Sequence, residues 1–120
     1  MKVIGIRGAI TCEHNSVEDI LLASRELMET IISLNQLNQE DIAAILFTTT
    51  KDLTAVHPAR AVRDMGWSIS PLLCFQEMDV ENSLEKCIRV LILWNTDKRS
   101  DQIQHVYLRE ARQLRPDLFN

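Results

Sequence analysis

Two arginines stand where a folded strand usually carries an apolar or small residue. Arg7 lies within Gly5-Ile6-Arg7-Gly8-Ala9, and glycine in a strand often marks the close approach of a ligand or another backbone. Arg89 lies within the apolar run Cys87 to Trp94, which is typical of a strand buried on both faces. Desolvating a guanidinium there costs roughly several kcal/mol unless an anion compensates it. Both arginines are therefore candidates for binding a small anion.

Each of these features also has a purely structural interpretation. Arg7 can belong to an edge strand and reach solvent, and Arg89 can form an ion pair with Glu77 or Asp79. The polar run Thr48-Thr49-Thr50 can bind phosphate, although a threonine-rich strand end explains it equally well. The residue types alone leave these alternatives open.

The segment Cys74-Phe75-Gln76-Glu77-Met78-Asp79 turns from an apolar strand into acidic residues, at a place where site residues are common. Glu77 can act as a general base, although a solvated loop carboxylate is equally ordinary. A nucleophilic Cys74 would need a base to form the thiolate. The histidines are all distant from it in sequence: His14, His57 and His105. We therefore expect Cys74 to be a buried, unreactive thiol.

The composition predicts one soluble globular domain over residues 1–120. Hydrophobic residues make up 46% and charged residues 25% of the chain, an ordinary balance. No run approaches the roughly 20 apolar residues of a membrane span, and the N-terminus lacks the pattern of an export signal. The three cysteines form no CxxC pair, which argues against a disulfide framework or a zinc site. We expect a cytoplasmic protein.

The charge distribution favours a small anion over nucleic acid as a partner. A net charge of −4 at pH 7 argues against a general nucleic-acid binder. Arginines nevertheless gather in the second half of the chain: Arg60, Arg63, Arg89, Arg109, Arg112 and Arg115. Arginines that only lie on the solvated surface would give the same composition. There is no P-loop, GxGxxG, HExxH, GxSxG or EF-hand motif, so electrostatic chemistry or simple ligand binding remains, with no metal and no cofactor expected.

The elements that must position these residues follow from periodicity. Strands are expected over 2–11, 42–50, 69–76, 87–95 and 104–108, a long helix from a cap at Asn15 or Ser16 to about Asn35, and a short helix from Pro58 to Gly66. The long helix has one apolar stripe: Val17, Ile20, Leu21, Ser24, Leu27, Met28 and Ile31. The expected fold class is α/β (α+β), a mixed sheet of about five strands with the long helix on one face.

Several blocks, weak singly, form a recognisable series over nearly the whole chain: Gly5-Ile6-Arg7-Gly8-Ala9, Asp52-Leu53-Thr54-Ala55-Val56-His57-Pro58-Ala59, Cys74-Phe75-Gln76-Glu77-Met78-Asp79-Val80, Lys86-Cys87-Ile88-Arg89-Val90, Gln104-His105-Val106-Tyr107-Leu108 and Leu114-Arg115-Pro116-Asp117-Leu118. In order and spacing they resemble the monofunctional bacterial chorismate mutases of the Bacillus type, which are distinct from the all-helical chorismate mutases. The resemblance implies a pseudo-α/β-barrel homotrimer whose sites lie at subunit interfaces.

The same resemblance implies a reaction without a nucleophile, metal or cofactor. Members convert chorismate to prephenate, a step toward phenylalanine and tyrosine. The reaction is a Claisen rearrangement, in which an ether bond breaks while a carbon–carbon bond forms within one molecule. No proton must move, so the absence of a catalytic motif fits this chemistry.

The resemblance also implies roles for individual residues. Arg89 would hydrogen-bond the ether oxygen and hold a carboxylate, Arg7 would bind a carboxylate, and Glu77 would accept a hydrogen bond from the ring hydroxyl. Further substrate-binding positions are implied at Cys74 and Leu73 beside the ring, Tyr107 on a carboxylate, His57, Ala59, Arg60 and Arg63 near the entrance, and Leu114 and Arg115 in a closing C-terminal segment.

The chain departs from the family at three of these positions. Arg60 replaces lysine, which preserves the charge. His57 replaces phenylalanine, which makes one pocket wall polar, and Leu73 replaces threonine, which removes a hydrogen-bonding group. Three rival interpretations remain: a non-catalytic module that senses an aromatic-pathway acid, an interaction domain whose arginines form interfacial salt bridges, and an enzyme that uses Cys74 as nucleophile.

Overall fold

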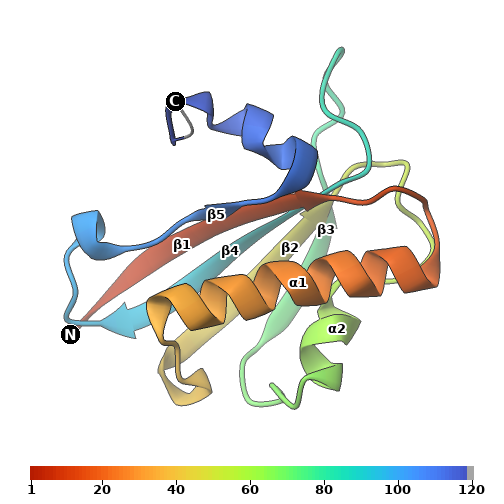
Figure 1. Ribbon diagram of the computed structural model, residues 1–120. Coiled ribbons are helices and arrows are strands. Elements are labelled where there is room, and N and C mark those ends of the chain that lie inside the picture. The colour runs from red at the N-terminus through yellow and green to blue at the C-terminus, as the bar shows by residue number, and fades with distance from the viewer. Residues whose placement is uncertain (119–120) are drawn as a thin grey trace.

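The computed structural model describes residues 1–118, which form one mixed sheet with two helices on one side (Figure 1). The strands are β1 (Lys2–Thr11), β2 (Ile42–Thr49), β3 (Leu72–Gln76), β4 (Cys87–Thr96) and β5 (Val106–Tyr107), and the helices are α1 (Val17–Asn35) and α2 (Ala59–Asp64). The strand order is β3-β2-β4-β1-β5. β4 runs antiparallel to both β1 and β2, whereas the outer strands β3 and β5 run parallel to their neighbours. The predicted fold class is confirmed.

Element boundaries differ from the prediction mainly at the outer strands. β3 begins at Leu72 and not at Ile69, whose side chain is 62% exposed, because the chain joins β2 only where Pro71 accepts a hydrogen bond from the Ile45 amide. β5 contains only Val106 and Tyr107. Within residues 1–118, no helix is long and apolar enough to cross a membrane.

The long helix begins at the predicted cap and covers one face of the sheet. The Ser16 hydroxyl accepts a hydrogen bond from the Asp19 amide, which satisfies one free N–H of the first turn. The buried stripe is Ile20, Ala23, Ser24, Leu27, Met28, Ile31 and Asn35. The predicted stripe is wrong at its start, since Val17 is 41% exposed and Leu21 is only partly buried. The stripe packs on β1 closely enough that a Cβ on Gly8 would lie 2.8 Å from Ile31 Cδ1.

The opposite face of the sheet is open over much of its area. A short 3-10 helix, η3 (Arg109–Leu114), crosses one end of it (Figure 1) and buries a small cluster of Ala9, Cys87, Tyr107 and Ala111. The rest leaves large apolar side chains exposed: Val3 55%, Leu73 56%, Phe75 49% and Leu91 36%. The expectation that β4 is buried on both faces is therefore wrong for the single chain, because only one face has a helical cover.

Candidate active site

Strand register places the predicted catalytic residues in two neighbouring rows on the open face. One row crosses the sheet through Tyr107, Ala9, Arg89, Thr48 and Phe75, and the next contains Arg7, Leu91, Leu46 and Leu73. Because Arg7 pairs with Leu91 and Ala9 pairs with Arg89, the two arginines are diagonal neighbours on adjacent strands, within reach of one long ligand.

Glu77 reaches the same place from the end of β3. Its amide donates to the Thr49 carbonyl at 2.8 Å, and its Oε2 accepts from the Thr48 hydroxyl at 2.5 Å. The same oxygen lies 3.7 Å from Nε of Arg89. The Arg89 side chain remains 39% exposed and that of Glu77 28%. The pair predicted as the structural alternative therefore exists, but its groups still face accessible space.

A cavity of about 320 Å³ lies between these charges, bounded by Arg7, Leu46, Thr48, Phe75, Glu77, Arg89, Val90 and Leu91. On the other side of the Arg89–Glu77 pair, the loop between β3 and β4 encloses a second space of about 660 Å³. The first cavity thus combines two guanidinium groups and one carboxylate with an apolar wall. That arrangement suits an anionic, partly apolar ligand that also carries a hydrogen-bond donor.

The C-terminal segment approaches this face over Tyr107. The Tyr107 side chain is buried, and its hydroxyl makes no hydrogen bond of good geometry among residues 1–118, although the Arg115 guanidinium lies close enough to interact with it. The Arg115 guanidinium lies 5.9 Å from the Tyr107 ring centroid and forms two hydrogen bonds with Asp117, at 3.1 and 3.0 Å. These bonds lower the pKa of Asp117. Leu114, half-buried, packs against the same small cluster.

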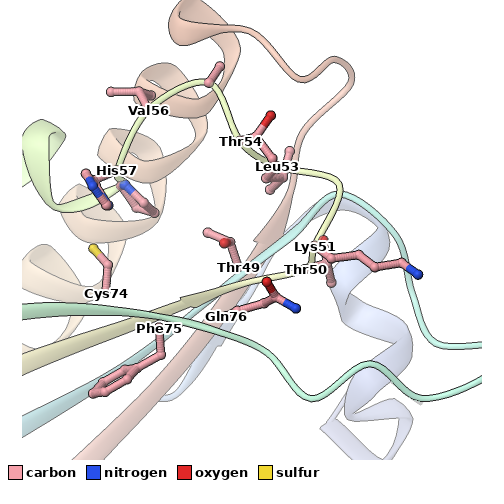
Figure 2. A pocket seen from close by; sticks show the side chains of 12 residues that line it. Thr49, Thr50, Lys51, Leu53, Thr54, Val56, His57, Cys74, Phe75 and Gln76 are labelled. Atoms are coloured by element: carbon pink, nitrogen blue, oxygen red, sulfur yellow. The ribbon is translucent and has the colours of Figure 1, made fainter.

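Cys74 lies on the other face of its strand. Figure 2 shows it in a separate cavity with His57, while Phe75 projects to the opposite side of β3. This cavity has about 450 Å³ and is bounded by the loop after β2 and the end of β3. The sequence separation of Cys74 and His57 gave no hint of their proximity. The Cys74 side chain does not bound the cavity of Arg7, Glu77 and Arg89 within one chain.

The thiols show no sign of activation. Burial raises the pKa of Cys12 to about 11 and also raises the pKa of Cys87. Over the described chain, no hydrogen bond joins Cys74 to His57 or to any other group. Nor do residues 1–118 contain a group of three or more His, Cys, Asp or Glu side chains placed to hold a metal ion.

The remaining predicted residues lie on the helical side or at the far edge of the sheet. Ala59 is only 4% exposed and packs into the core, so its side chain offers a ligand little surface. Arg60 and Arg63 are exposed on α2, where Arg60 lies 3.8 Å from Asp64. Leu73 is exposed on the open face, with β2 and β4 lying between its strand and that of Arg7. A single chain therefore brings together only part of the predicted set.

Thr48 and His105 are two residues in this region that sequence reasoning did not assign to the site. Thr48 holds the Glu77 carboxylate, whereas its polar run had only suggested a phosphate site. His105 accepts a hydrogen bond from the Arg7 amide at 3.0 Å. Both contacts depend on strand register between distant segments, so no local signal could have identified them.

Comparison with known proteins agrees with this geometry. The family described as chorismate mutase type I matches residues 3–118. The chain is 49% identical over 119 residues to chorismate mutase AroH of Bacillus subtilis, covering 98% of this chain and 94% of the relative. It is 50% identical over 117 residues to chorismate mutase AroH of Thermus thermophilus, covering 97% and 96%.

A solved structure supports the same assignment. Chorismate mutase from Clostridium thermocellum superimposes with a TM-score of 0.90 at 45% identity, over 92% of this chain and 98% of that one. The chain belongs to the type I chorismate mutase family. It is accordingly an isomerase, and the predicted family, fold and activity are confirmed. The non-catalytic sensor that we weighed as the alternative is not favoured.

Proposed function

We propose that chorismate binds in the cavity between Arg7, Glu77 and Arg89 and rearranges there to prephenate, in the pathway to phenylalanine and tyrosine. The observation that carries the proposal is the convergence of these three side chains on one cavity of about 320 Å³ with an apolar wall. Arg7 and Arg89 bind the two carboxylates of the substrate, and Glu77 accepts a hydrogen bond from its ring hydroxyl. The apolar wall packs against the ring.

The chemistry needs a fixed donor more than it needs an acid or a base. As the bond between carbon and the ether oxygen lengthens, negative charge grows on that oxygen while the new carbon–carbon bond forms. A guanidinium N–H of Arg89, already oriented, stabilises this charge. The Thr48 hydroxyl and the Arg89 guanidinium hold the Glu77 carboxylate, so Glu77 orients the ring hydroxyl without taking its proton. Orientation by all three groups favours the reactive conformer.

The C-terminal segment completes the proposed site. The buried Tyr107 hydroxyl makes no hydrogen bond of good geometry among residues 1–118, and an unsatisfied buried hydroxyl is uncommon. A substrate carboxylate would supply the missing partner once the segment moves. Arg115, already placed over the Tyr107 ring, and Leu114 would then close over the ligand.

The assembly that we propose is a homotrimer, a pseudo-α/β-barrel in which each site lies between two copies of the domain. The exposed apolar side chains Val3, Leu73, Phe75 and Leu91 provide a surface that monomers rarely leave open. A neighbouring copy would bring the predicted residues that one chain leaves outside the cavity: His57, Ala59, Arg60, Arg63, Leu73 and Cys74. Free cysteines throughout residues 1–118 fit a reducing cytoplasm as the location.

Subunit mixing tests the site and the assembly together. Arg89→Ala and Arg63→Ala each remove one proposed half of a site, so each protein alone should convert chorismate to prephenate poorly. After unfolding and refolding as an equal mixture, an intact site needs an intact Arg89 half and an intact Arg63 half from the neighbour. Random assembly gives one half times one half, about a quarter of wild-type activity.

The control is the double variant, Arg63→Ala with Arg89→Ala, mixed with wild type. A site in this mixture is intact only where both contributing chains are wild type, so refolding together should lower the activity from one half of that of the same amount of wild-type protein to about a quarter. If the two single variants remain as inactive together as apart, although mixed trimers form, then the two halves do not belong to one site between subunits.

A further inference from the structure

At Arg7, beside the proposed site, the edge of β1 is hydrogen-bonded by a side chain and not by a neighbouring backbone. β5 pairs only with Gly8 and Ala9 of β1, and Arg7 lies just before this short ladder. The Arg7 amide points toward β5 and donates to Nδ1 of His105 at 3.0 Å. The imidazole thus supplies the acceptor that a longer β5 would supply from its main chain.

Gly8 explains why Arg7 needs this support. A Cβ at Gly8 would lie 2.8 Å from Ile31 Cδ1 and 3.1 Å from the Val106 carbonyl oxygen, so the close packing of β1 against α1 and β5 favours glycine. Glycine loses more backbone freedom on folding than other residues and weakens a strand. The position of Arg7 next to it therefore depends on bonds from both sides, namely from β4 opposite Leu91 and from His105.

The hydrogen bond fixes the protonation state of the ring. Nδ1 accepts only when it carries no proton, so His105 is neutral with its hydrogen on Nε2. The charged groups that face it are both cations: Arg7 on β1 and Arg115 after η3, the latter paired with Asp117. Burial, followed by the charges of Arg115 and Arg7, lowers the pKa of His105. Protonation would place an N–H against the Arg7 amide and a third positive charge beside two arginines.

We propose that His105 is a positioning residue for the rearrangement, which holds the Arg7 backbone in register so that the Arg7 guanidinium meets the substrate carboxylate. Tyr107 lies two residues after His105, in β5, where it pairs with Ala9 of β1. The inference rests on the proposed role of Arg7. It gives His105 a function through Arg7 and β5, without contact with the substrate.

Two variants of similar shape separate the acceptor from the bulk of the ring. In His105→Asn, Oδ1 takes the place of Nδ1 and accepts from the Arg7 amide at every pH. In His105→Leu, a methyl group takes that place. We expect kcat/KM for chorismate at pH 7.5 to fall on the order of tenfold in His105→Leu, as for the loss of one oriented hydrogen bond, and to stay near wild type in His105→Asn.

The pH profile provides the second measurement. In the wild type, kcat/KM should fall as the pH drops through the lowered pKa of His105, which lies below the ordinary histidine value of about 6.5, because the folded protein then binds a proton at the expense of the contact with Arg7. The unfolded chain binds that proton more readily, so stability also decreases as the pH falls through this window. His105→Asn should lack this decrease, both in kcat/KM and in the free energy of unfolding.

Nitrogen-15 shifts of the wild-type ring provide a test that does not depend on any variant folding. They should show Nε2 protonated and Nδ1 bare at pH 7.5. A proton on Nδ1, or wild-type kcat/KM in folded His105→Leu, overturns the proposal. The variant Arg7→Ala distinguishes a failure of the proposed role of His105 from a failure of the proposed active site. Near-normal turnover in Arg7→Ala removes the site itself, whereas an inactive Arg7→Ala beside a normal His105→Leu removes only the role of His105.

Discussion

The two faces of the sheet use the same strands in different ways. On the face under α1, alternate residues of β4 are Ile88, Val90 and Ile92, each at most 4% exposed. On the other face the intervening residues include Arg89 and Leu91, which keep 39% of the side chain and 36% of the residue exposed. Because successive side chains point to opposite faces, one strand supplies both a sealed core and a charged site.

This difference between the two faces shows where the fold can place a charged side chain with a small desolvation penalty. A guanidinium on the helical face would displace apolar side chains and lose its hydration. On the open face, Arg89 keeps some water and lies 3.7 Å from the Glu77 carboxylate. The two faces can therefore be tested separately, since substitutions on the open face should alter activity and substitutions on the helical face should alter stability.

The largest expected effect is on the open face at Arg89. In Arg89→Lys the charge remains, but the compact ammonium does not reproduce the planar fork of donors. We expect kcat to fall on the order of 10²-fold or more, as for the loss of one donor to a developing oxyanion. Conversion of chorismate measures the rate, and chemical denaturation should show nearly unchanged stability.

The matched control is Arg99→Lys. Arg99 is an exposed arginine just beyond the C-terminal end of β4, with its own carboxylate partner, Asp101, at 3.1 Å. The same chemical change there should leave turnover unaltered. Turnover in Arg89→Lys close to that of Arg99→Lys would show that the positive charge alone is sufficient and that the planar donor geometry is not required.

The next effect compares two glycines of β1 that point to opposite faces. Gly8→Ala places a methyl group 2.8 Å from Ile31 Cδ1, 3.2 Å from Leu27 Cδ1 and 3.1 Å from the Val106 carbonyl oxygen, so two buried side chains of α1 and the backbone of β5 must shift together. We expect the free energy of unfolding to drop by about 1–3 kcal/mol. Gly5→Ala meets only the end of the flexible Leu91 side chain, at 3.2 Å.

Urea denaturation of both variants measures the difference directly. Gly5→Ala should change stability by less than about 1 kcal/mol, because the crowding is offset by the lower backbone entropy of alanine in the unfolded chain. Equal losses in the two variants would contradict the view that only the helical face of the single chain is tightly packed.

Much of this division was predictable from local pattern. The alternation in β1 placed Arg7 on the face opposite Ile4, Ile6 and Ile10, and the serine cap placed the start of α1. Cys74 and Glu77 are three residues apart, an odd separation that favours opposite faces of an extended segment. The sequence therefore already indicated that one chain would not turn both side chains toward the same ligand.

Other features depended on long-range packing. The apolar run of β4 predicted burial on both faces, but the sequence does not reveal which face a helix covers. The contact of Thr48 with Glu77 depends on parallel pairing of β2 with β3, and that of His105 with Arg7 joins residues 98 positions apart. Such contacts follow from register, which local propensity does not determine.

The smallest expected effect concerns the cavity of Cys74 and His57 in Figure 2. Cys74→Ala should retain most of the turnover, because no hydrogen bond activates the thiol in the described chain and the rearrangement needs no nucleophile. Alkylation of the folded wild type should modify Cys74 first, since Cys12 and Cys87 are buried and burial raises the pKa of both thiols. A fall in Cys74→Ala comparable with that of Arg89→Lys would show that the thiol takes part in the reaction, against the proposed rearrangement without a nucleophile.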